Sequence, residues 1–122
     1  MVLDAHVGAR DDEWQLARFD FTGGSLWARD AGLAVGSHVR VRVLARDVSI
    51  SRHPSEDSSI QNLLPATITA IAEDEHPSLA LVQARVGDSL LLARLTRRAA
   101  AQLALEIGDT IWLQVKSVAL LE

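Results

Sequence analysis

The sequence predicts an all-β fold built from two small barrel-like units in tandem. Two runs alternate apolar and polar residues with a period of two, VRVRVL at 39–44 and IWLQVK at 111–116. That period is typical of strands with one buried face. Glycine-containing turn signals separate the runs, at Gly23-Gly24, Gly36-Ser37, Gly87-Asp88 and Gly108-Asp109. Many short strands at this spacing favour a barrel or a sandwich.

Short strands and one clear helix are expected along the chain. The strands are expected at Val2–Val7, Trp14–Phe19, Ser25–Ala28, 39–44, Val48–Ser51, Ala66–Ile71, Leu79–Val86, Ser89–Leu95, 111–116 and Val118–Leu121. The helix is expected from Arg97 to about Ala104, with Thr96 as its N-cap. A further helical turn is expected over Ser59–Leu64, ended by Pro65. The acidic runs at 11–13 and 73–75 are expected at the tips of hairpin loops.

The two halves of the chain resemble each other on either side of a polar, serine-rich stretch. Residues 14–29 align with 81–94, and 36–50 align with 108–121, although any two strand-rich halves align loosely. The second half alone inserts a helix, between its third and fourth strands. These observations predict a first unit over residues 1–52, a linker over 53–58 and a second unit over 59–122.

Composition narrows the range of functions. The 122 residues contain no cysteine, so disulfides and thiolate metal sites are absent, and the net charge is −4. An acidic chain without clustered bases is not expected to bind nucleic acid. The N-terminus lacks the pattern of a signal peptide, and no run approaches the length of a membrane span. We therefore expect a soluble, cytoplasmic domain.

No pattern for catalysis or metal binding is present in the sequence. The four histidines are scattered at His6, His38, His53 and His76, without metal-ligand spacing. Lys116-Ser117 superficially resembles the end of a phosphate-binding loop, but the required glycines are missing. Paired carboxylates occur only in the predicted loops, where they are solvated. The chain is therefore expected to be no enzyme and to carry no cofactor.

Small polar residues and the only lysine remain as candidates for binding an oxyanion. Ser59 precedes the predicted turn that contains Gln61, and Thr96 precedes the predicted helix. Unpaired N–H groups at a helix N-terminus favour an anion. Lys116 and Ser117 would add one positive charge and one hydroxyl. Each residue also has a simpler interpretation, as a helix cap or as a solvent-facing strand residue.

Two segments resemble the Mop domain, a molybdate- and tungstate-binding module. They are SSIQNLLPATITAI at 58–71 and ARLTRRAAAQLALEIGDTIWLQVKSVALL at 93–121. With VRVRVLARDVSI upstream, the whole chain resembles the C-terminal regulatory region of the ATPase subunit of molybdate ABC importers. That region has a TOBE-type arrangement, in which an incomplete first unit precedes a Mop unit. The resemblance implies tandem OB-like small β-barrels of the Mop/TOBE type, with one short helix in the second.

The resemblance also implies a ligand, molybdate or tungstate, and the residues that contact it. The anion-contacting positions of the family fall on Ser59, Gln61, Thr96, Lys116 and Ser117. In free-standing family members such sites lie between neighbouring Mop units, and both units contribute residues. Gln61 stands where the motif has arginine, so a charged bidentate donor is replaced by a neutral one. Ala66 stands where the motif often has glycine.

As a function, the resemblance implies an accessory, regulatory domain that dimerises through its Mop-like unit and senses the oxyanion. Its partners would be an upstream ATPase domain of the same subunit and, through it, the membrane permease. The location would be cytoplasmic and peripheral to the inner membrane. Two alternatives remain at this point: a free-standing molybdate-storage protein of the molbindin type, and an OB-type nucleic-acid module, which the acidic charge and few aromatic residues disfavour.

Overall fold

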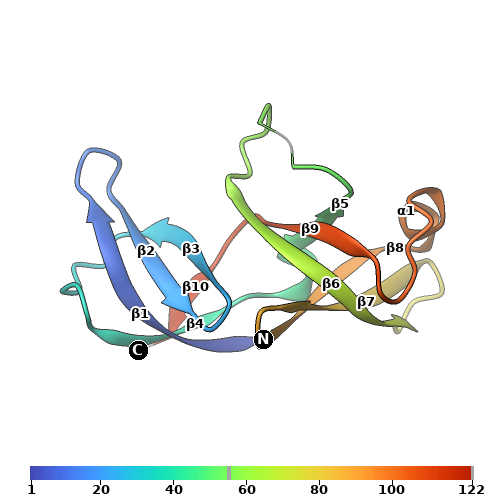
Figure 1. Cartoon of the computed structure of the whole chain (residues 1–122), viewed down its shortest axis with the longest axis horizontal. Coiled ribbons are helices and arrows are strands. Elements are labelled where there is room, and N and C mark those ends of the chain that lie inside the picture. Colours follow the sequence, from blue (N-terminus) through green and yellow to red (C-terminus); the bar gives the residue numbers. More distant parts are fainter. Residues whose placement is uncertain (55, 122) are drawn as a thin grey trace.

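The computed structural model describes residues 1–54 and 56–121, and it confirms the all-β prediction. Two curled five-stranded antiparallel sheets lie side by side (Figure 1). None of the helices in these residues is long and apolar enough to cross a membrane. The strands are β1 (Val2–Asp11), β2 (Leu16–Phe21), β3 (Gly24–Arg29), β4 (His38–Arg42), β5 (Val48–Ser51), β6 (Asn62–Glu73), β7 (Leu79–Val86), β8 (Ser89–Thr96), β9 (Thr110–Val115) and β10 (Ala119–Leu121). The helical elements are the 3-10 turn η1 (Ala45–Asp47) and the helix α1 (Arg97–Gln102).

The alternating runs form strands because every second side chain is buried. In β4, Val39 and Val41 face inward, and the residues that alternate with them are exposed. In β9, Ile111, Leu113 and Val115 also face inward. Each such valine, leucine or isoleucine contributes about 1.5–3 kcal/mol by burial. The inward side chains of both sheets join one continuous core. The acidic runs lie at hairpin tips, as expected, because β1 ends at Asp11 and β6 ends at Glu73.

The prediction of a helical turn over Ser59–Leu64 is wrong, because β6 begins at Asn62 and runs through Pro65. The N–H and C=O groups of Ile68 bond towards the β9 side of β6. Pro65 lies an odd number of residues away, so its backbone faces the opposite side. On that side the pairing with β7 begins only at Thr67. The missing N–H of proline therefore removes no hydrogen bond from the sheet.

The last strand of each half pairs with the other half of the chain. The strand order is β10-β4-β1-β2-β3 in one sheet and β5-β9-β6-β7-β8 in the other. Thus β5, from the first half, extends the second sheet, and β10, at the end of the chain, extends the first (Figure 1). Both sheets contain five strands, and neither is formed by one continuous stretch of sequence. Within the predicted linker, residues 53, 54 and 56–58 form no helix or strand, and residue 55 lies outside the described residues.

The internal repeat also appears in the details of strand pairing. The β1–β2 ladder shifts its register between Val7 and Ala9, and the β6–β7 ladder shifts between Ile68 and Ala70. The pairing that precedes each shift places Phe19 opposite Val7 and Ala84 opposite Ile68. Equivalent positions in the two units therefore carry side chains of very different size.

The two units contact each other through the turns of their β2–β3 and β7–β8 hairpins. A Cβ atom added to Gly87 would lie closer than 3.0 Å to the Cα atom of Gly23, and one added to Gly23 would meet the carbonyl oxygen of Val86 equally closely. Both glycines have positive φ, +59° and +108°. The Ser89 hydroxyl also donates to the Thr22 carbonyl. The absence of side chains at 23 and 87 lets the two backbones pack against each other.

The predicted helix is present but shorter than expected. α1 ends at Gln102, and Ala104 reverses the chain with a left-handed φ of +52°. The Arg52 guanidinium donates to the carbonyls of Leu103 and Ala104, at 2.7–3.2 Å, and it pairs with Asp109 at 3.0 Å. The last carbonyl groups of a helix have no hydrogen-bond donor within the helix, and here Arg52 supplies donors at the end of α1.

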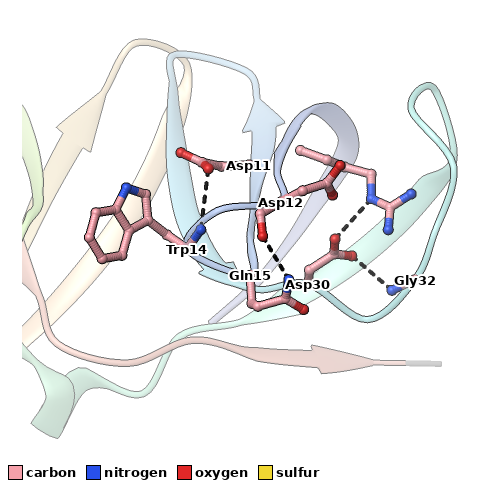
Figure 2. A network of polar contacts seen from close by, with 7 residues as sticks. Asp11, Asp12, Trp14, Gln15, Asp30 and Gly32 are labelled. Carbon is pink, nitrogen blue, oxygen red and sulfur yellow. Dashed lines mark hydrogen bonds and ion pairs between the residues drawn. The ribbon is translucent and has the colours of Figure 1, made fainter.

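Asp30 fixes the loop after β3 to the end of β1. Its carboxylate accepts from the Gly32 N–H at 2.8 Å and from Arg10 at 2.9 Å (Figure 2). These two contacts, the Gly32 N–H first, hold the pKa of Asp30 below its ordinary value. Asp74 is held in a similar way by the Glu75 N–H and by Arg94, and its pKa is also lowered.

The Asp30→Asn substitution is expected to lower thermal stability at neutral pH but not in acid. A lowered folded-state pKa means that the ionised carboxylate stabilises the fold above the ordinary aspartate pKa of about 3.9. This contribution is lost as the pH falls through the lowered folded-state pKa. Melting curves between pH 7 and pH 2.5 should therefore differ at neutral pH and converge at the acid end. Asp12→Asn is the control, because the Asp12 carboxylate makes no hydrogen bond or ion pair with the described residues. A gap for Asp30→Asn that persists in acid would contradict the assignment.

Candidate oxyanion site

Four of the five predicted site residues lie at one end of the β6–β9 pair. Asn62, the first residue of β6, pairs with Val115, the last residue of β9. Gln61 therefore precedes the same end of the ladder at which Lys116 and Ser117 leave it, and Ser59 lies two residues before Gln61. Pairing between strands distant in sequence thus brings the glutamine, the lysine and the two serines to one region.

Thr96 lies at the opposite end of the sheet. It pairs with Leu79, at the start of β7, while Ala80 pairs with Glu73, at the end of β6. Residues 62 and 73 are the two ends of β6, which corresponds to about 35 Å along the strand at 3.3 Å per residue. α1, which Thr96 precedes, accordingly lies far from the start of β6 (Figure 1). One copy of the chain does not bring Thr96 to the other four residues.

The polar groups of these residues are available to a ligand. Ser59, Gln61, Thr96, Lys116 and Ser117 are all exposed. The Lys116 backbone is fixed by its N–H, which donates to the Asp47 carbonyl at 2.8 Å. Its ammonium group makes no ion pair with the residues the structure describes. The Thr96 hydroxyl oxygen accepts from the Ala99 N–H at 3.0 Å as an N-cap, so its proton can still be donated elsewhere.

The helix N-termini that supported the oxyanion prediction contribute little in the structure. Ser59 precedes a strand rather than a helical turn, and α1 has only six residues. Among the predicted site residues themselves, the positive charge is that of the Lys116 ammonium group, and the other groups are hydroxyl and amide donors. A lysine on a flexible stem supplies a point charge without the fixed geometry of an arginine.

A hollow beside Gln61 was missed by sequence reasoning. It measures about 540 Å³ and is lined by Asp11, Trp14, Leu16, Trp27 and Gln61. Trp14 is 68% exposed at the tip of the β1–β2 hairpin, and its indole points away from the polar contacts of that hairpin (Figure 2). Sequence patterns predicted Trp14 and Trp27 in two separate strands. They did not predict that both would lie beside Gln61, which follows Trp27 by 34 positions.

Asn62 is the second residue that sequence reasoning missed. Its side-chain oxygen accepts from the Trp27 N–H at 2.8 Å, and its side-chain nitrogen donates to the Trp27 carbonyl at 2.8 Å. The amide therefore satisfies the free backbone edge of β3, which is the outermost strand of its sheet. This pair of hydrogen bonds joins the first sheet to the strand end that carries Gln61.

A further hollow lies away from the predicted site residues. This second hollow, of about 600 Å³, lies on the second sheet and includes Arg52, Thr67, Arg85 and Trp112, but none of the five predicted residues. Its Arg52 is already engaged with Asp109 and the end of α1. Among residues 1–54 and 56–121, no group of three or more histidine, aspartate or glutamate side chains could hold a metal ion.

Comparison with known proteins places these features in a family. The TOBE domain matches residues 58–121. The chain is 59% identical over 121 residues to the molybdenum import ATP-binding protein ModC of Methylococcus capsulatus, and 55% identical over 120 residues to that of Thiobacillus denitrificans. These alignments cover 99% and 98% of the chain but only 34% and 33% of the two relatives. The chain thus spans about a third of the length of the relatives it matches.

A solved structure confirms the architecture. The fold superposes on the cytoplasmic molybdate-binding protein ModG, described with molybdate bound, with a TM-score of 0.79 over 98% of this chain and 94% of that one. Sequence identity is 23%, so this likeness concerns the fold. The matched family is a domain that is not itself catalytic, in agreement with the sequence prediction. Together with the two-sheet fold, the match over more than half of the chain establishes that the protein belongs to the TOBE domain family.

Proposed function

We propose that the chain is the regulatory part of the ATP-binding subunit of a molybdate importer, and that it binds molybdate or tungstate at the cluster of Ser59, Gln61, Lys116 and Ser117. The observation that carries the proposal is the identity of 59% across almost the whole chain to a molybdenum import ATP-binding protein. The likeness in fold to a molybdate-binding protein supports the ligand. The full subunit would add an ATPase domain, and it would work with a membrane permease at the cytoplasmic side of the inner membrane.

The chemistry of the cluster suits a tetrahedral oxyanion. Lys116 supplies one full charge, the hydroxyls of Ser59 and Ser117 supply donors, and the Gln61 amide supplies two N–H donors. Hydrogen bonds from an ionised donor are roughly twice as strong as those between neutral groups. Because Gln61 is neutral, the affinity of the cluster depends mainly on Lys116.

A second copy of the chain completes the proposed site. Thr96 lies too far along the sheet to reach Lys116 of the same chain. The Mop resemblance implies sites between neighbouring units, so Thr96 of one copy would face the Lys116 cluster of its twin. We therefore propose that the chain forms a homodimer through its second unit, and the anion would stabilise this dimer by mass action.

Titration calorimetry with sodium molybdate tests this function, with sulfate as the competing anion. We expect saturable binding of molybdate, and a loss of at least about tenfold in affinity for Lys116→Ala, because a hydrogen bond to a charged group contributes about 1.5–3 kcal/mol. Arg40→Ala is the matched control: it removes an exposed positive charge on the first sheet, outside the cluster. No heat at millimolar molybdate, or equal affinity of the two variants, would contradict the proposed site.

The free-standing storage protein remains the second candidate, because ModG matches this chain over 94% of its own length. The two candidates predict different assemblies. Light scattering coupled to size exclusion, with and without molybdate, would give the mass of a dimer for the transporter domain. A stable trimer or hexamer would favour storage.

A further inference from the structure

Asn62 lies at the junction between the proposed site and the first sheet. Its backbone pairs with Val115, so it stands beside both strand ends that carry the site, one residue from Gln61 and one pairing step from Lys116. Its side chain points the other way along the molecule, to the backbone of Trp27.

The bond between Asn62 and Trp27 is specific in geometry. An asparagine amide presents one acceptor and one donor side by side, and the edge of a strand presents one N–H and one C=O in the same way. Both hydrogen bonds measure 2.8 Å, within the ordinary range for N–H···O. Asn62 thereby fixes the start of β6 against β3 in one position, as a neighbouring strand would.

Trp27 lies close enough to Gln61 for its fluorescence to respond to changes at the proposed site. Trp27 lines the hollow beside Gln61, together with Trp14. A movement of Gln61 on binding an anion therefore changes the surroundings of Trp27 in two ways, through the hollow and through the hydrogen bonds of Asn62. The acidic side chain of Asp11, in the same hollow, disfavours an anion within it and directs one to the Lys116 side of Gln61.

We propose that Asn62 is a positioning residue of the oxyanion site: it holds Gln61 and Lys116 in the binding arrangement by anchoring them to β3 of the first unit. The inference rests on the proposed function. Because energetic coupling is reciprocal, anion binding at the cluster must in turn act on β3. The first unit then serves as the part of the domain that responds when the second unit is occupied.

A single-tryptophan chain tests the inference. Trp14→Phe and Trp112→Phe leave Trp27 as the only tryptophan. Molybdate is titrated while Trp27 emission and calorimetric heat are followed in parallel, with N-acetyltryptophanamide correcting for absorption by the anion. We expect Trp27 emission to shift with the same midpoint as the heat. Adding Asn62→Ala should abolish the shift and weaken affinity about tenfold, and Asn62→Gln, which keeps donor and acceptor, should restore part of the shift.

Ser89→Ala is the matched control, because it removes a side-chain hydrogen bond between the two sheets at a different place, the hairpin turns. It should change neither affinity nor the Trp27 response. Unchanged affinity in Asn62→Ala, with the parent chain binding normally, would overturn the positioning role alone. Absence of binding by the chain with all its tryptophans would instead overturn the proposed function, and the inference with it. Far-UV circular dichroism of each variant shows whether the fold is retained.

Discussion

The Gly87→Ala substitution is expected to lower the free energy of unfolding by about 2–5 kcal/mol. Gly87 has a left-handed φ of +59°, which costs alanine about 1–2 kcal/mol. The added methyl group would also lie closer than 3.0 Å to the Cα atom of Gly23 in the other unit. Backbone cannot rotate away as a side chain can, so the two hairpin turns must separate, at a further cost of about 1–3 kcal/mol. Urea unfolding followed by tryptophan fluorescence measures the sum.

Gly36→Ala separates the two causes. Gly36 has a φ of +93°, but an added methyl group there meets nothing within 4 Å. Its substitution should show the conformational cost alone, about 1–2 kcal/mol. Equal losses at Gly36 and Gly87 would mean that the contact between the hairpins contributes nothing to stability.

The Phe19→Ala substitution is expected to have a still larger effect, about 3–5 kcal/mol. Phe19 is 1% exposed and lies between its strand partners, Val7 on β1 and Leu26 on β3. Its removal leaves a cavity that close-packed neighbours fill only in part. Denaturant unfolding should show the loss as a lower midpoint, and the conservative Phe19→Leu should retain most of the stability and keep the comparison measurable if the alanine variant does not fold.

The second unit provides the matched test of this packing argument. Ala84 occupies the equivalent position of the repeat and is fully buried. Ala84→Phe should destabilise by about 1–3 kcal/mol, through overpacking instead of a cavity. If Phe19→Ala cost less than about 1.5 kcal/mol, the first unit would have to collapse around the missing ring, and its core would be more adaptable than its burial indicates.

Local patterns were enough to predict most of the strands. Residues 39–44 and 111–116 alternate so regularly that they predict strands with one buried face, and the structure has strands over His38–Arg42 and Thr110–Val115. The Thr96 cap was also predictable, because an N-cap depends on a residue and its nearest neighbours. Pro65 misled the prediction. Whether a proline is tolerated in a strand depends on which neighbouring strand it faces, and that is decided by residues far along the chain.

For the candidate site, too, the sequence predicted one part and the tertiary structure decided the rest. The resemblance identified Ser59, Gln61, Thr96, Lys116 and Ser117 as a set, but it could not show which of them one chain brings together. The pairing of Asn62 with Val115 gathers four of them and leaves Thr96 at the far end of the sheet. The contact between Asn62 and Trp27 has no signal in the sequence, because 35 residues separate its partners and neither belongs to a periodic pattern.

By itself, the sequence determined that this protein is an all-β domain with a repeated unit and a short helix, and its resemblance to the Mop domain predicted a set of residues for an oxyanion. Burial of every second side chain and the turn residues between the runs carry that information locally. Only the tertiary structure decided that β5 and β10 exchange sheets, that two glycine turns meet, and that Asn62 joins the two units. These are pairings of backbone with backbone or with a single amide. Backbone groups are the same in every residue, so their partners are selected by the geometry of the whole fold.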